Sequence, residues 1–301
     1  LQVNCGFRVL ENDSIGDPVF ADIAWYAGIA ETDWSWAPLV QDFDNDGWRD
    51  IIFTNGYPKD VTDHDFMAFR NKSSQVATKE FLLEQIPQVK IHNYAFRNNG
   101  DLTFSNTTEA WGLSTPSFSN GGAYADLDND GDLDLVINNI NDEAMVYRNV
   151  QREQYAQQSH YLRIRLEGDS LNRMGLGTWI ELYNDGSVQA YEQTTVRGYL
   201  SSIQPDVHFG LGAVTDVDSI CVKWPDGKMQ VLRQVKANQW LTVSYSEADQ
   251  QWSPEHPRIT PLFRDITYAT GIQFVHRDDD FIDFNIQKLL PHKLSEYGPA
   301  L

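Results

Sequence analysis

Nine aspartates are concentrated in two short segments of this 301-residue chain, residues 41–51 and 125–135. Both segments have the pattern D-x-D-N-D-G-x-x-D, and an apolar run follows each of them directly. Carboxylates at alternate positions of so short a loop repel one another unless a cation lies among them. Ca²⁺ takes about six to eight oxygen ligands, and the glycine permits the backbone reversal that wraps such a loop around an ion. The sequence therefore predicts two calcium sites.

The predicted ligands are carboxylates together with one backbone carbonyl in each loop. In the first loop they are Asp42, Asp44, Asp46 and Asp50 with the carbonyl of Trp48, and in the second Asp126, Asp128, Asp130 and Asp134 with the carbonyl of Asp132. An EF-hand loop carries Glu at its twelfth position and lies between two helices. That position is Phe53 in one copy and Ile137 in the other, so we expect a loop between two β-strands. The alternative is a pair of solvated turns that bind nothing, which the duplication disfavours.

A second motif, F-x-[DN]-x-[TA] followed by a turn that ends in glycine, precedes each Asp loop and is expected to open each repeat unit. Its copies begin at Phe20 and Phe104, which are 84 residues apart, like Asp42 and Asp126, and a third copy begins at Phe263. Four or so short strands per unit are typical of propeller blades, which span about 40–60 residues. The excess length predicts an insertion at about 58–90. We expect it to contain a helix over residues 76–86 whose apolar stripe packs on the blades.

After residue 150 the pattern changes to alternating strands separated by tight turns. Polar segments at 151–159 and 246–261 predict linkers, so residues 155–247 are expected to form a β-sandwich. Its predicted core includes Leu162, Ile164, Leu166, Ile180, Leu182, Val222 and Leu241.

The flanking motifs and Arg97-Asn98-Asn99-Gly100 make the first 150 residues resemble FG-GAP/VCBS repeats, the blades of integrin-type propellers. The second part resembles the ASPIC/UnbV domain. The motifs that carry this resemblance include Asn172-Arg173-Met174-Gly175-Leu176-Gly177, Arg197-Gly198-Tyr199-Leu200-Ser201-Ser202 and His208-Phe209-Gly210-Leu211-Gly212. Residues 258–301 resemble the start of a further propeller array in large bacterial surface proteins.

The predicted fold is therefore all-β, with propeller blades at 1–150, a sandwich at 155–247 and a further repeat at 258–301. Two Asp loops do not complete a propeller, so the chain is expected to be a fragment. The resemblance implies a calcium-binding interaction or adhesion module, extracellular or at the outer cell surface, with a protein or glycan partner.

Composition excludes other classes of function. With 43 acidic and 23 basic residues, a net charge of −20, the chain is not expected to bind nucleic acid. Its apolar runs are too short to span a membrane, and its two cysteines, Cys5 and Cys221, give no disulfide framework.

The residues suggest no catalytic constellation, and His208, within an alternating strand, is expected to be structural. A polysaccharide-processing enzyme on a calcium-stabilised propeller and a structural spacer remain as alternatives. Trp34 and Trp36 flank Ser35 and are expected on one side of a strand. Together with Trp48 they either pack between blades or form an aromatic platform for a sugar or partner.

The predicted sandwich gives a first testable expectation. Residues 155–247 expressed alone should show a cooperative thermal transition, a β-type far-ultraviolet spectrum and no stabilisation by Ca²⁺, because the segment carries its own apolar core. A segment that stays unfolded would contradict this, and one that Ca²⁺ stabilises would contain a metal site.

Overall fold

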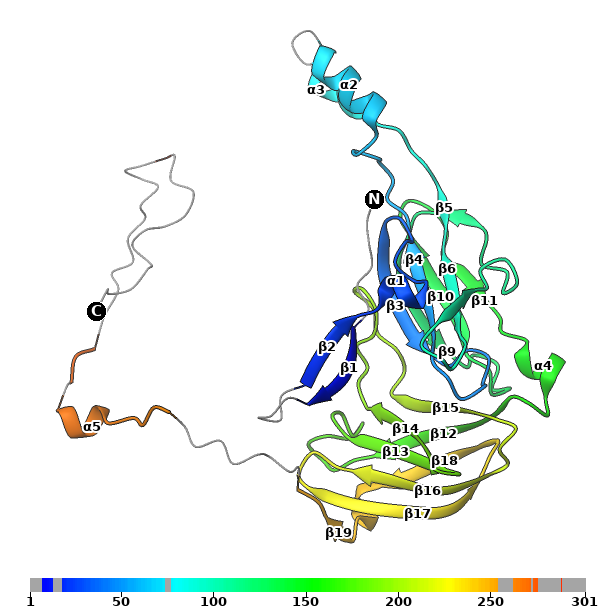
Figure 1. Ribbon diagram of the computed structural model, residues 1–301, viewed down its shortest axis with the longest axis vertical. Helices are drawn as coiled ribbons and strands as arrows, with labels where there is room; N and C mark the ends of the chain where they lie inside the picture. The colour runs from blue at the N-terminus through cyan, green and yellow to red at the C-terminus, as the bar shows by residue number, and fades with distance from the viewer. Residues whose placement is uncertain are drawn as a thin grey trace. The chain divides into compact units, whose positions relative to one another are not determined.

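Each Asp loop joins two neighbouring strands of an antiparallel sheet (Figure 1). The computed structural model describes residues 7–12, 18–73, 77–253, 262–271, 273–275 and 288. The chain divides into two units, Leu1–Pro254 and Glu255–Leu301. The first unit contains both Asp loops and all the sheets described below.

The first blade-like sheet has four strands and the second has three. The first has the order β3-β4-β6-β7, with bounds Ser35–Gln41, Asp50–Asn55, Tyr94–Asn98 and Phe104–Asn106. The second has the order β11-β10-β9, with bounds Met145–Tyr147, Asp134–Asn139 and Ser119–Ala125. The Asp loops lie between β3 and β4 and between β9 and β10. The predicted loop between two strands is thus observed in both copies, and the two sheets do not close into a ring within the described residues.

Strand β7 corrects the expected boundary between repeats. We expected the motif at Phe104 to open the second unit, but β7 pairs antiparallel with β6, with Arg97 opposite Ser105. A short turn containing Gly100, at φ 76°, makes β6 and β7 a hairpin. The length of a repeat is the same whichever residue is taken as its start. The repeat alone therefore does not show whether the strand at Phe104 belongs to the first sheet or to the second.

Smaller elements surround the two sheets. They are the hairpin β1 (Phe7–Asn12) and β2 (Pro18–Asp22), helix α1 (Ala24–Ala27), the pair β5 (Ile91–His92) and β8 (Pro116–Ser117), and helix α4 (Gln151–Tyr155). Helix α1 ends at Gly28, whose φ of 77° is left-handed, and its Ala24 and Ala27 pack on Phe53 and Phe96 of the first sheet.

The insertion contains two helices, α2 (His64–Ser73) and α3 (Lys79–Glu84). Helix α3 confirms the helix expected near residues 76–86, and the Thr78 side chain caps it by accepting a bond from the Phe81 amide at 3.2 Å. Only part of the apolar run expected to pack on the blades is covered. Ile86 is buried and Leu82 half-buried, whereas Phe81 and Leu83 are 47% and 45% exposed. Both helices lie beyond the end of β4 (Figure 1).

Residues 160–251 form two sheets packed face to face. One has the order β15-β12-β18, with bounds Asp206–Gly212, His160–Glu167 and Gln239–Ser244. The other has the order β14-β13-β16-β17-β19, with bounds Ser187–Glu192, Trp179–Asn184, Asp216–Lys223, Lys228–Lys236 and Gln250–Gln251. A 3₁₀ turn, η1 (Tyr245–Glu247), precedes the last strand.

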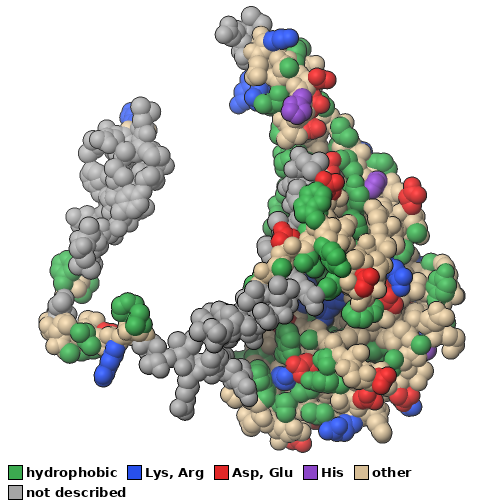
Figure 2. Space-filling view, in the orientation of Figure 1, with side chains coloured by type: hydrophobic (Ala, Val, Ile, Leu, Met, Phe, Trp, Pro, Cys, Tyr) green, Lys and Arg blue, Asp and Glu red, His purple; other side chains and the backbone are tan. Residues whose placement is uncertain are grey.

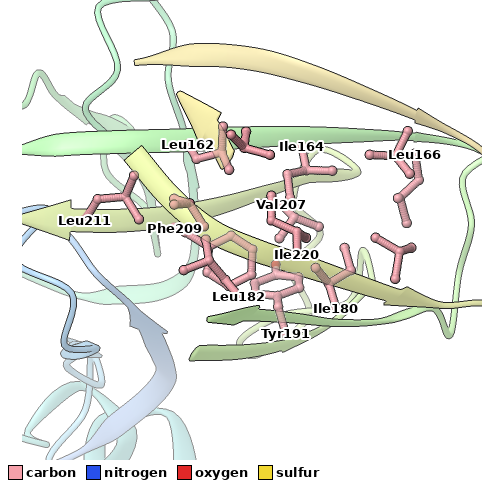
Figure 3. Close-up of a cluster of buried hydrophobic side chains, with 14 of the residues drawn as sticks. Leu162, Ile164, Leu166, Ile180, Leu182, Tyr191, Val207, Phe209, Leu211 and Ile220 are labelled. Carbon is pink, nitrogen blue, oxygen red and sulfur yellow. The ribbon is translucent and has the colours of Figure 1, made fainter. Parts of the chain in front are cut away.

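Apolar side chains from both sheets meet between them and form a core of their own (Figure 3). Six of the predicted core residues are buried there and Leu241 packs against them. The turn between β13 and β14 has Asp185 and Gly186 at φ 46° and 76°, which matches the right-handed twist of a two-residue hairpin.

One loop of this sandwich leaves it and packs on the blades. Between β14 and β15, Ile203 is buried in the cluster that the two blade-like sheets share, beside Leu39 and Leu135. Ser201 accepts a bond from the Gly122 amide at 3.1 Å through its hydroxyl. The sandwich therefore has its own core, yet it also completes the core of the blades.

In the small unit, α5 (Thr267–Thr270) follows the third copy of the repeat motif. It ends at Gly271 with φ 71°, as α1 ends at Gly28. Most of the expected further repeat lies outside the described residues.

The junction between blades and sandwich buries an imidazole. The Nε2 atom of His208, on β15, is 2.7 Å from the Oδ1 atom of Asn45 in the first Asp loop, and the side chain is 4% exposed. Burial, and then the nearby Arg163, lower the pKa of His208 to about 3. This burial agrees with the structural role expected for it.

This depressed pKa predicts a pH dependence of stability. The unfolded state, with a pKa of about 6.5, binds the proton more tightly, so the contribution of His208 is present above that value and is lost as the pH falls toward about 3. In metal-free protein, His208→Gln should lose less stability than wild type between about pH 7 and pH 5 by chemical denaturation. Equal pH slopes for the two proteins would contradict the assignment.

Candidate metal centres

The two Asp loops have the same backbone shape. The asparagine at the fourth position has a φ of 58° at Asn45 and 60° at Asn129, and the glycine at the sixth has 96° at Gly47 and 97° at Gly131. Asparagine tolerates the left-handed region better than most residues, and glycine adopts it without strain. The shared sequence pattern thus gives both loops the same backbone conformation.

The same hydrogen bonds hold both loops closed. The first aspartate accepts bonds from the amides of the fifth and sixth residues, at 3.1 and 2.7 Å for Asp42 and at 3.1 Å each for Asp126. The last aspartate accepts from the amide of the second residue, at 3.0 Å for Asp50 and 2.8 Å for Asp134. These bonds turn the carboxylates toward the interior of each loop.

Each loop brings together three carboxylates whose oxygens lie within 4.8 Å of one another. They are Asp42, Asp44 and Asp50 in the first loop, and Asp126, Asp128 and Asp130 in the second. Six of the ten predicted ligand residues therefore belong to two clusters, and each cluster could hold a metal ion.

The other four predicted ligand residues lie outside these clusters. Asp46 accepts bonds from the Trp48 amide at 2.8 Å and from the Arg97 Nη2 atom at 2.7 Å. Asp134 accepts from two backbone amides, and Asp132 accepts from the Asn45 side chain at 2.9 Å and the Arg152 amide at 2.7 Å. The Trp48 side chain is 53% exposed, and the ligand roles assigned to the Trp48 and Asp132 carbonyls stay predictions.

Burial and repulsion from neighbouring carboxylates make several of the loop aspartates costly to ionise. Burial, and then Asp44, raise the pKa of Asp50 to about 7. Burial, and then Asp50 and Asp44, raise the pKa of Asp42 well above its ordinary value. In the second loop burial raises the pKa of Asp132 to about 6 and also raises that of Asp130.

A hard cation fits this donor set. All clustered donors are carboxylate oxygens, the ligands that Ca²⁺ and Mg²⁺ prefer. The Oδ2 atom of Asp130 is buried and lacks a hydrogen-bond partner, although a buried carboxylate oxygen normally has one. An ion in the cluster would satisfy that oxygen and balance the charge.

An arginine beside each loop was not foreseen as part of the site. Arg97 Nε lies 2.6 Å from Asp44 Oδ2, and Arg148 Nε lies 3.0 Å from Asp128 Oδ2. Each is followed by an asparagine whose amide donates to the last loop aspartate, Asn98 at 2.9 Å and Asn149 at 2.8 Å. The repeated tripeptide, aromatic-Arg-Asn at 96–98 and 147–149, is the sequence signal that identifies them.

The loops also meet each other and the sandwich. The Asn45 side chain donates to the Gly131 carbonyl at 3.2 Å and thus bridges the two loops. Arg163 on β12 is 2% exposed, and its Nη1 atom lies 2.5 Å from Asp126 Oδ2. The guanidinium stacks over the Trp240 ring, 3.6 Å from the centroid. Sequence spacing gave no indication of this contact, which joins residues of two different folds.

The class of protein follows from comparison with known families. Residues 89–137 match the FG-GAP-like repeat, and residues 168–250 match the ASPIC and UnbV family. The first range contains the second Asp loop, and the second contains most strands of the sandwich. The chain thus carries an FG-GAP-like repeat followed by an ASPIC and UnbV domain, and the resemblance found in the sequence is confirmed.

The chain is distantly similar to cartilage acidic protein 1. It is 26% identical to the human protein over 258 residues, 76% of this chain and 38% of that protein. It is 24% identical to the Xenopus tropicalis protein over 271 residues, 78% of this chain and 41% of that protein. The chain spans about two fifths of the length of these curated relatives. Among the described residues, no helix is both long and apolar enough to cross a membrane.

The raised carboxylate pKa values predict how a bound cation and pH interact. The folded protein holds the Asp50 proton more tightly than the unfolded chain, so this contribution to stability is present below about pH 4 and is lost as the pH rises through about 7. A divalent cation balances the charges that appear over this range. Adding Ca²⁺ to metal-free protein should therefore raise the melting temperature more at about pH 8 than at about pH 5. Differential scanning fluorimetry with and without chelator measures this, and equal shifts at both pH values would contradict it.

Proposed function

We propose that this chain is a calcium-binding, non-catalytic interaction module of the cell surface or extracellular space, whose blade-like sheets belong to a β-propeller. The observation that carries the proposal is the duplicated loop that draws three carboxylates together in each copy. The FG-GAP-like repeat supports the propeller, since such repeats are blades.

Calcium suits these loops better than other common metals. The clusters offer carboxylate oxygens, with neither thiolate nor imidazole among the clustered groups. Mg²⁺ demands near-ideal octahedral geometry and keeps several waters, whereas Ca²⁺ accepts the irregular arrangement that a short loop provides. The remaining predicted ligands, Asp46, Asp134 and the two carbonyls, would complete the coordination.

The ions have a structural role in this proposal. Protein ligands come from one loop per site, and these loops lie at the junction between blades and sandwich, where Arg163 and Asn45 are buried. An ion bound there fixes the turn between two strands and neutralises charge that the fold has removed from water. Ca²⁺ would then stabilise the native state as any ligand specific to it does.

An extracellular setting agrees with this chemistry. The human relative is named for cartilage and for its acidity, and this chain has a net charge of −20. On the face drawn in Figure 2, Lys and Arg side chains are scattered among acidic ones, which does not suit a nucleic-acid partner. We infer a protein or glycan partner instead.

Titration of metal-free chain with Ca²⁺ tests the metal sites. Calorimetry should show two sites, and Asp44→Asn and Asp128→Asn should each remove one, because each carboxylate belongs to one cluster. At a free Ca²⁺ concentration of about 100 times Kd, each filled site adds about 2.7 kcal/mol to the free energy of unfolding.

The matched control is Asp216→Asn, which changes an exposed carboxylate of the sandwich that pairs with Lys236. It should keep both sites and the full Ca²⁺-dependent stabilisation. Wild-type protein that gives neither binding heat nor a change in stability would contradict the proposal.

The interaction role is tested separately, with glycan arrays and pull-down from extracellular extracts in Ca²⁺ and in chelator. We expect a partner whose capture requires Ca²⁺, since the ions hold the module in its native form. Turnover of an acidic polysaccharide would instead establish an enzyme.

A further inference from the structure

A cavity of about 500 Å³ lies at the opposite end of the first blade-like sheet from its Asp loop. The Asp loop joins the end of β3 to the start of β4, whereas the cavity is lined by Trp34, which precedes β3, and by Gly56 and Tyr57, which follow β4. Both ends of the helical insertion, near Asp60 and Val89, complete the lining. The cavity is therefore separate from the candidate metal centres.

An aromatic wall forms one side of this cavity. The rings of Trp34 and Tyr57 stack with centroids 5.0 Å apart and an angle of 22° between their planes. Trp36 lies 6.3 Å from each of them, and its indole nitrogen donates to the Gly56 carbonyl at 2.9 Å. Trp34 and Trp36 thus lie on one side, as the sequence predicts, and they are half-buried.

The backbone beneath this wall is fixed. Gly56 has a φ of 121°, and a Cβ atom there would lie 2.7 Å from the Ser117 carbonyl oxygen. Only glycine permits so close an approach, which places Tyr57 beside Trp34. The backbone that carries Tyr57 is consequently restrained by the fold itself.

Negative charge predominates in the lining. Three carboxylates line the cavity, those of Glu31, Asp33 and Asp60, against one cation, Lys59. The Lys59 ammonium donates to the Leu83 carbonyl at 2.5 Å. None of the three carboxylates forms a salt bridge within the part of the chain that the structure describes.

We propose that this cavity binds an organic ammonium group, of the kind carried by choline or by a lysine side chain. Aromatic faces attract cations, and carboxylates at the rim strengthen that attraction. The methyl or methylene groups of such a ligand would cover the Trp34 and Tyr57 rings, which a hydrated metal ion does not do. The volume is in the range of small-molecule sites, about 300–1,000 Å³.

This inference deepens the interaction role proposed above and rests on it for the identity of a partner. It does not rest on metal binding. The helical insertion is the element that gives the first sheet this cavity, since Lys59, Asp60, Thr62 and Val89 all belong to it.

The test uses the full chain in saturating Ca²⁺, so that added cations do not compete for the Asp loops. Choline, Nα-acetyl-lysine amide, methyl glucoside and 3,3-dimethyl-1-butanol, the uncharged isostere of choline, are titrated by calorimetry and by tryptophan fluorescence. We expect at least one of the two ammonium ligands to bind, and the better of them identifies the source of the group. The uncharged isostere should bind more weakly by about threefold to thirtyfold, the range of a cation–π contact.

Three variants make the test specific. Trp34→Leu and Asp33→Asn should each weaken binding of the ammonium ligand at least threefold, the first by removing the ring and the second by removing only charge. Trp179→Leu, an exposed tryptophan of the sandwich, is the matched control and should bind as wild type does. A cooperative thermal transition and a far-ultraviolet spectrum like that of wild type show that each variant is folded.

The outcomes separate the two proposals. Equal affinity for choline and its isostere, binding of methyl glucoside alone, or no binding of any ligand would each overturn the ammonium site. Ammonium binding by a chain that Ca²⁺ does not stabilise would overturn the metal proposal and keep this one.

Discussion

The structure depends on one constraint: several negatively charged aspartates are buried close to one another. The first Asp loop holds Asp42, Asp44 and Asp50 at 7% exposure or less, and their proximity raises the cost of ionising Asp42 and Asp50. Removing carboxylates from water without compensation is far more costly than any single packing contact could offset. The backbone amides inside the loop and the arginine on the third strand compensate this charge, and the carboxylate cluster could hold a cation that would compensate it further. The glycine and asparagine with positive φ in each loop meet the same requirement, because they let the backbone amides point toward the carboxylates.

The sandwich helps to compensate the buried carboxylate charge, and its packing on the loops in turn depends on that compensation. Its Arg163 pairs with Asp126, and its His208 meets Asn45, so the domain that follows the repeat forms part of the surroundings of both loops. Close approach is possible because glycines lie at the contacts. A Cβ atom on Gly210 would lie 1.9 Å from the Asp42 carboxylate, and one on Gly131 would lie 2.0 Å from the Tyr161 ring. The H-F-G-L-G motif therefore has a physical role at the junction, where the two domains pack closely against each other.

Local chemistry was predictable from the sequence, and contacts between distant segments were not. The Asp loops, their position between strands and the sandwich core follow from spacing and alternation, which act over a few residues. The pairing of Arg163 with Asp126 joins positions 37 residues apart, one on a strand of the sandwich and one in an Asp loop, and neither residue's neighbours indicate it. The apolar run of α3 shows a related limit. Phe81 and Leu83 are two residues apart and so lie on different sides of the helix, and the sequence does not show which side meets another surface. The boundary at Phe104 failed because a repeat has no unique starting point.

The two ends of the first sheet differ in how well they accommodate inserted residues. At the Asp-loop end, Asp50 accepts bonds from Phe43 and Asn98 at once, so the loop and the third strand fix each other. Extra residues there would break bonds to buried charge. At the other end, where the connection between β4 and β6 leaves and rejoins the sheet, the amide of the buried Asn55 donates to the Asn93 side chain at 2.9 Å, and the helical insertion extends beyond this fixed base. Loops of variable length carry recognition in many folds because the scaffold beneath them stays rigid. The same arrangement is found here. The charged junction with the sandwich makes the scaffold rigid. The opposite end of the sheet, where Trp34, Tyr57 and the insertion meet, provides a surface that can be specific to this protein.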